Sequence, residues 1–132
     1  MTEEEDRRLA RGMRTALKLF DPASGRAPSF KYPKEIAEDW NHFSISTVMG
    51  DVWGREAIEA KDRAMITIGV LTATGKTEQL KAYVVGGLNL GLSRKEICEI
   101  ILHVSVYAGF PAAIQGFAAA NEVFDTLDAE AD

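Results

Sequence analysis

The feature that most constrains this chain is an apolar segment enclosed by a helix start and a helix stop. Residues 97–108 are apolar almost throughout, and they follow Ser-Arg-Lys-Glu at 93–96 and precede Gly109. In a capping box, the serine and the glutamate satisfy each other's free backbone donors. A glycine after a helix supplies the residue that ends it. The segment could be a strand by composition, but these caps favour a helix. Its apolar circumference is typical of a helix at the centre of a bundle or shared with another subunit.

Other segments carry similar signals, and together they predict an all-α fold. Apolar residues at helical spacing and helix-ending glycines or prolines predict helices over residues 1–20, from Pro33, over 59–74, over 77–90 and from Pro111. The sequence MGDVWG, 49–54, is predicted to be a turn or short helix, 21–30 a linker, and 127–132 a frayed tail. We therefore expect one domain, 1–132 with its core at 33–127, built as a bundle of about six to seven helices.

Composition excludes several classes of function. The net charge of −5 argues against a nucleic-acid groove, which needs a basic face. No apolar run reaches the roughly 18 residues of a membrane span. The single cysteine, Cys98, allows no intramolecular disulfide, so we expect a cytoplasmic protein. Gly86 and Gly87 lie inside a predicted helix, where each costs about 1 kcal/mol relative to alanine. Close approach of another helix usually offsets such a cost, so self-association is expected.

The chemistry-bearing residues of the apolar helix form one stripe. Glu96, Glu99, His103 and Tyr107 recur at helical spacing. A carboxylate four residues before a histidine can fix the imidazole's tautomer and favour its protonated form. Such a histidine beside a pocket can supply or remove a proton, and a tyrosine hydroxyl can donate to a developing oxyanion. The alternative is a purely structural hydrogen bond or a solvated helix face.

Other candidates are less specific. Arg55 and Arg63 could each bind a carboxylate through two N–H groups, or pair with neighbouring acids. His42 is expected at the edge of the core, and Cys98 is expected to be a small buried hydrophobe. No set of histidines and carboxylates has the spacing of metal ligands, so no metal site is predicted.

Two motifs resemble a known family. GDVWGRE at 50–56 and GLSRKEICEIILHVSVYAGFPAA at 91–113, with the spacing between them, resemble the carboxymuconolactone decarboxylase family over Gly50 to Phe124. The resemblance implies an alkylhydroperoxidase D-like helical fold assembled as a homo-oligomer, a hexamer or a trimer. It also implies a lyase of aromatic compound catabolism. Such an enzyme removes carbon dioxide from 4-carboxymuconolactone, giving the 3-oxoadipate enol-lactone, without a cofactor.

The resemblance assigns expected roles to residues of this chain. His103 is expected to be the general acid/base, Glu99 to orient it, and Tyr107 to donate to the oxygen that gains charge. Arg55 or Arg63 would hold the substrate's carboxylate.

The chain departs from the family pattern at four positions. The Cys-x-x-Cys and histidine of the peroxidase branch align with Lys76, Gln79 and Tyr83, and a glutamate of its proton relay falls near Ala64. Because the thiolate carries the peroxidase chemistry, a thiol peroxidase is not expected. Many decarboxylase-type members also have a histidine where this chain has Tyr83, which could bind substrate but is a poor proton shuttle. Two alternatives therefore stay open. One is a proton-transfer enzyme acting on another carbonyl substrate. The other is a non-catalytic small-molecule-binding or assembly protein.

Overall fold

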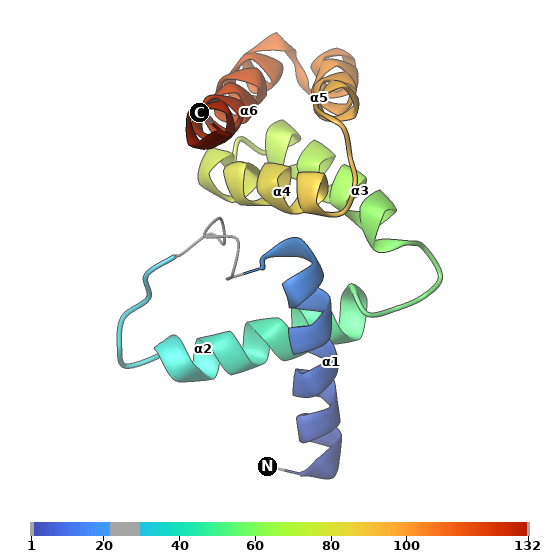
Figure 1. Cartoon of the computed structure of the whole chain (residues 1–132), viewed down its shortest axis with the longest axis vertical. Helices are drawn as coiled ribbons and strands as arrows, with labels where there is room; N and C mark the ends of the chain where they lie inside the picture. The colour runs from blue at the N-terminus through green and yellow to red at the C-terminus, as the bar shows by residue number, and fades with distance from the viewer. Residues whose placement is uncertain (1, 22–29, 132) are drawn as a thin grey trace. The chain divides into compact units, whose positions relative to one another are not determined.

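The computed structural model describes residues 2–21 and 30–131. All regular structure in these ranges is helical, as predicted (Figure 1). The elements are α1 (Glu3–Leu19), α2 (Ala37–Ser44), the π-helix η2 (Ile45–Val52), α3 (Ala60–Ala73), α4 (Thr77–Asn89), α5 (Arg94–Ala108) and α6 (Phe110–Ala131). They divide into two units, residues 1–60 and 61–132. The single domain expected from the sequence stays a prediction, and most of the predicted linker lies outside the described residues.

In the first unit, α1 packs closely against η2. Backbone meets backbone at Gly12, where a Cβ atom would collide with the carbonyl of Ile45. A bidentate ion pair adds to this contact, since Arg8 Nη2 lies 2.7 Å and Arg8 Nε 3.1 Å from Asp51 Oδ2. The predicted turn or short helix at 49–54 is thus mostly part of a π-helix that begins at Ile45. Such wide turns are rare and often lie near functional sites.

The second helix starts later than predicted. The carbonyl of Pro33 accepts hydrogen bonds from the N–H groups of Ile36 and Ala37, both at 3.0 Å, in a turn that precedes α2. Three apolar residues spaced along this segment, Ile36, Trp40 and Phe43, are exposed. This side of α2 is therefore an apolar surface and not part of the core.

The second unit has a core to which all four of its helices contribute. The apolar residues of this unit with no exposed surface are Ala64, Ile68, Leu80, Val84, Ile97 and Ile101, and Ala120 of α6 is 2% exposed. Helices α5 and α6 pack together, as do α4 and α6. A Cβ atom on Gly87 would lie 2.9 Å from Leu92 Cδ1 and 3.3 Å from Ile68 Cδ1. At Gly87, the close approach predicted for the paired glycines is thus made within this chain, by α3 and the loop after α4.

The predicted ends of α3, α4 and α5 are confirmed. Gly75, Gly91 and Gly109 have φ values of +70°, +101° and +102°, a region that side chains disfavour. In the capping box of α5, Ser93 Oγ accepts from Glu96 N at 3.0 Å, and Glu96 Oε1 accepts from Ser93 N at 2.9 Å.

The predicted frayed tail is wrong, because α6 continues to Ala131. Arg94 of α5 holds Asp128 through bonds of 2.6 and 3.2 Å, and its guanidinium lies 4.8 Å from the ring centre of Phe124. These contacts tie the last turns of α6 to the start of α5.

Candidate functional site

The predicted stripe lies on an exposed face of α5. His103 is exposed, and Tyr107 is 81% exposed. Their rings are in contact, with centroids 5.1 Å apart and planes inclined at 35°. The structure thus brings together two of the predicted site residues, a proton-transfer group and a hydroxyl donor one turn apart.

The two carboxylates of the stripe have other partners. Glu99 Oε1 lies 3.2 Å from Lys95 Nζ, one turn earlier on the same helix. Glu96 caps the helix, and the hydrogen bond from the backbone of Ser93 lowers the pKa of its carboxyl group. Among the described side chains, His103 makes no hydrogen bond to Glu99. This bond stays a prediction for the site with substrate bound.

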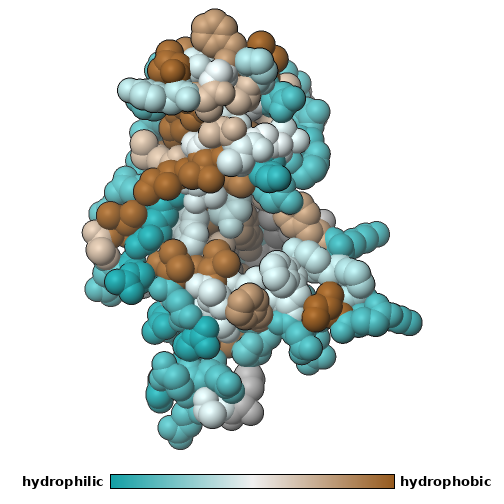
Figure 2. Space-filling view, turned by 180° about the vertical axis from the view of Figure 1, so that it is seen from behind, coloured by the Kyte–Doolittle hydropathy of each residue, from teal (hydrophilic) through white to brown (hydrophobic). Residues whose placement is uncertain are grey.

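Apolar side chains surround the stripe. Leu102 is exposed on α5, Val106 is 71% exposed, and Phe110 at the start of α6 is 69% exposed. Figure 2 shows apolar side chains, in brown, at the surface among hydrophilic ones on the face that it displays. In this chain, water reaches His103 at an open surface.

Two further predicted residues lie on other helices of the same unit. Tyr83 on α4 is half-buried, and this burial raises the pKa of its phenol above the ordinary value. Tyr83 is therefore neutral around pH 7 and can act only as a hydrogen-bond donor or acceptor. Arg63 on α3 is half-buried, and its buried Nε has no hydrogen-bond acceptor among the described residues.

Arg55, the remaining predicted residue, belongs to the first unit. It follows η2 in a turn, and its side chain lines a surface hollow with Arg11 of α1. The sequence did not predict Arg11 as part of any site. Its pairing with η2 depends on a packing contact between segments far apart in the chain.

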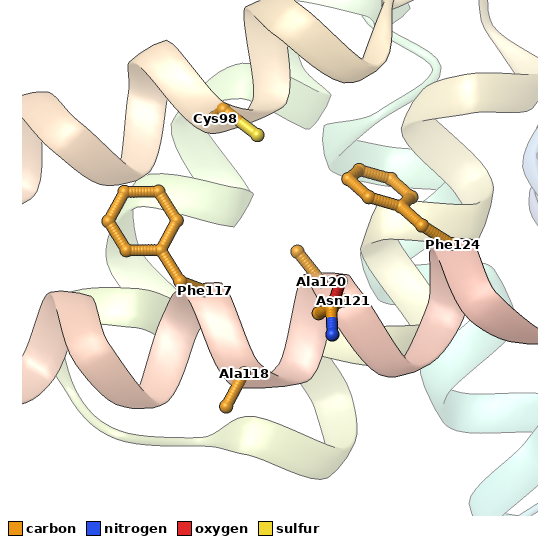
Figure 3. Close-up of a pocket in the computed structure, with 6 residues that line it drawn as sticks. All are labelled: Cys98, Phe117, Ala118, Ala120, Asn121 and Phe124. Carbon is orange, nitrogen blue, oxygen red and sulfur yellow. The ribbon is translucent and has the colours of Figure 1, made fainter.

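A pocket between α5 and α6 was also missed. It has a volume of about 390 Å³ and is lined by Cys98, Phe117, Ala118, Ala120, Asn121 and Phe124. Figure 3 shows the Cys98 sulfur pointing from α5 toward α6, with the rings of Phe117 and Phe124 on either side. Cys98 is half-buried and not fully buried as expected. None of the six predicted site residues lines this pocket.

Within 2–21 and 30–131, no helix is long and apolar enough to cross a membrane. Nor do any three His, Cys, Asp or Glu side chains of those ranges group as ligands of a metal ion.

These observations define a class of protein: an all-helical scaffold with a histidine–tyrosine pair on one helix face. The chain belongs to the carboxymuconolactone decarboxylase family, whose model matches residues 38–122 and so spans parts of both units. It is 36% identical over 93 residues to the 4-carboxymuconolactone decarboxylase of Acinetobacter baylyi, covering 70% of this chain and 69% of the relative.

Two other relatives differ in what their names say. The nitrosuccinic acid decarboxylase npaB of Metarhizium robertsii is 28% identical over 94 residues, covering 71% of this chain and 61% of the relative. An uncharacterized 15.0 kDa protein of Paracoccus denitrificans, from the nqo9-nqo10 intergenic region, is 30% identical over 124 residues, covering 92% and 87%. Two of the three relatives are thus named as decarboxylases.

Proposed function

We propose that this protein is a cofactor-independent decarboxylase of 4-carboxymuconolactone-like carboxylactones, with His103 as general acid/base. The observation that carries the proposal is the 36% identity to a 4-carboxymuconolactone decarboxylase over 70% of this chain. The second decarboxylase relative is named for a different carboxylic acid. The reaction type is thus common to the two relatives, while the substrate differs between them.

The residues suit the chemistry of such a reaction. When the bond to the carboxylate carbon breaks, carbon dioxide leaves and the electron pair moves into the conjugated lactone carbonyl. The hydroxyl of Tyr107 would donate to that oxygen, and protonated His103 would return a proton to carbon. Glu99, released from Lys95, would orient the imidazole by accepting its second N–H.

Arg63 supplies a cation on the same unit. A buried donor without an acceptor costs about 1–3 kcal/mol, and more when it is charged. The Nε of Arg63 is such a donor among the described residues. A carboxylate of the substrate would satisfy it, and half-buried Tyr83 would add a neutral hydrogen-bonding group to the same ligand.

We also propose that the protein works as a homo-oligomer, a trimer or a hexamer. Val106 and Phe110 are exposed by 71% and 69%, and such apolar side chains are usually covered by a partner when they form a contiguous surface. A second copy on this face of α5 would also shield His103 and Tyr107 from bulk water. Sedimentation velocity of the purified chain tests this part. A monomer at micromolar concentration would contradict it.

The experiment for the reaction is a direct assay. Loss of 4-carboxymuconolactone is followed by absorbance while released carbon dioxide is measured in the same sample. We expect one carbon dioxide for each lactone consumed. Lactone loss without carbon dioxide would indicate another reaction at the carbonyl, and no loss in an assembled oligomer would refute the proposed substrate.

One observation favours a second candidate. Tyr83 stands where many decarboxylase-type members have a histidine, and its burial keeps it neutral. A protein that binds a carboxylic acid or lactone without turnover would need only such a donor. Saturable binding of the lactone with no carbon dioxide release would support this candidate over the enzyme.

A further inference from the structure

The pocket between α5 and α6 shares no residue with the proposed reaction. Both helices belong to the second unit and pack against each other, so the pocket lies within one unit. Its volume is about 390 Å³, and sites for small molecules typically have about 300–1,000 Å³. One residue of α5 and five of α6 line it: Cys98, Phe117, Ala118, Ala120, Asn121 and Phe124.

Two phenylalanine rings form walls of the pocket. In Figure 3 the rings of Phe117 and Phe124 lie on either side of the Cys98 sulfur. Phe117 is 39% exposed, so part of this aromatic side chain is left in contact with water. A flat ring placed between the walls would contact both of them, and aromatic pairs favour centroid distances of about 4.5–7 Å. Cys98 adds a small apolar group to the same surface.

The Phe124 wall is held from outside the lining. The guanidinium of Arg94 lies 4.8 Å from the centre of the Phe124 ring, in a cation–π contact. Asp128 in turn holds this guanidinium through bonds of 2.6 and 3.2 Å. The ring is therefore positioned before any ligand binds, and such preorganisation lowers the entropic cost of binding.

The lining favours an uncharged ligand. None of the six residues that line the pocket is acidic or basic. The guanidinium beside Phe124 already has its counter-charge in Asp128. The one amide of the lining, Asn121, donates to Asp125 at 3.4 Å. A charged ligand would lose hydration here without gaining a counter-charge from the lining, which is costly.

We propose that this pocket binds a neutral, flat molecule of two or three aromatic rings. A dry apolar cavity of about 150 Å³ holds one benzene ring. The volume of about 390 Å³ between α5 and α6 has room for a larger ring system. The inference goes beyond the proposed function, because it needs neither the lactone nor turnover.

Binding is measured by fluorescence titration with N-phenyl-1-naphthylamine, a neutral aromatic compound that fluoresces strongly only in apolar surroundings. Its charged counterpart, 8-anilino-1-naphthalenesulfonate, has the same rings and adds a sulfonate. Wild type is compared with Phe117→Ala and with a control, Phe43→Ala. Phe43 is an exposed phenylalanine of α2 in the first unit, so the control removes the same ring from a different apolar surface.

Cys98 gives a second readout that needs no variant. It is the only cysteine of the chain, so alkylation by iodoacetamide, followed by mass spectrometry, reports on this pocket alone. We expect Cys98 to react in the free protein. With N-phenyl-1-naphthylamine at about four times its dissociation constant, the reaction should slow about fivefold, because about one pocket in five is then empty.

We expect Phe117→Ala to weaken binding of the neutral compound about tenfold, the effect of losing one aromatic contact with its buried area. Phe43→Ala should bind it as wild type does. Equal weakening by Phe43→Ala would overturn the proposal, because the compound would then bind exposed apolar surface in general. Tighter binding of the sulfonate than of the neutral compound would overturn the assignment to an uncharged ligand. Cys98 that fails to react in the free protein, as when a second copy covers the pocket, would also overturn the proposal.

Discussion

The packing of α6 against α3 and α5 can be tested at Gly116. Alanine inside a helix is favoured over glycine by about 1 kcal/mol. At Gly116, however, a Cβ atom would lie 2.8 Å from Thr72 Cγ2 and 3.2 Å from Ile101 Cγ2. Neither neighbour can move easily, because Ile101 has no exposed surface and the buried hydroxyl of Thr72 donates to the carbonyl of Ile68 at 2.8 Å. Overpacking costs about 1–3 kcal/mol, so Gly116→Ala should destabilise by about 1 kcal/mol.

Gly69 on α3 provides the matched control. It lies inside a helix of the same unit, yet the nearest atoms to an added Cβ are Ile100 Cγ2 and Val104 Cγ2, both at 3.9 Å. That distance is ordinary van der Waals contact. Gly69→Ala should therefore keep the gain in helix propensity and stabilise the chain by about 0.5–1 kcal/mol.

The assay is urea unfolding followed by circular dichroism, with the wild type and both variants at one protein concentration. We expect the two unfolding free energies to differ by about 2 kcal/mol, with the wild type between them. If Gly116→Ala stabilised the chain as much as Gly69→Ala does, the contact of α6 with Thr72 and Ile101 would be refuted.

Three further predictions concern a cap, an ion pair and a half-buried phenol. Ser93→Ala removes the capping box of α5 and should cost about 1 kcal/mol in urea unfolding; an unchanged midpoint would contradict the cap. Arg8 holds the pKa of the Asp51 carboxyl below its value in the unfolded chain. The ion pair therefore stabilises the folded chain at pH values above the unfolded pKa, and this stabilisation is lost as the pH falls through the folded pKa. The thermal unfolding midpoint of Asp51→Asn should therefore lie below that of wild type near neutral pH and approach it in acid. A difference between the two midpoints that widened in acid would refute the pairing. Burial raises the pKa of Tyr83, so the phenol stays neutral and Tyr83→Phe should leave the shape of the pH–rate profile unchanged up to about pH 10. A change of rate at high pH that wild type shows and Tyr83→Phe lacks would mean that the phenol ionises, and would contradict this prediction.

Local signals in the sequence were sufficient for most helix ends. The capping box at Ser93 and the glycines at 75, 91 and 109 act within a few residues, so they can be recognised without the fold. The π-helix could not be predicted, because its packing partner Gly12 lies far away in the chain. The full length of α6 was missed for the same reason, since Arg94 and Asp128 are 34 residues apart.

The candidate site was predictable in its spacing and not in its surroundings. The i, i+4 rule correctly placed His103 beside Tyr107. The same rule also offers Lys95 as a partner for Glu99, and this is the pair that the structure contains. Exposure of Val106 and Tyr107 could not be read from an apolar sequence, because burial depends on which surface covers the helix.

We propose that His103 transfers the proton in a decarboxylation. Turnover of 4-carboxymuconolactone by His103→Ala, with and without added imidazole, tests this role beside wild type and a His42→Ala control. Because His103→Ala removes the imidazole ring, the variant leaves room for free imidazole to take its place. We expect His103→Ala to lose about 10²- to 10⁴-fold in turnover while keeping its oligomeric state, and imidazole to restore part of it. Wild-type turnover in His103→Ala would contradict the claim, as would a loss that His42→Ala shares.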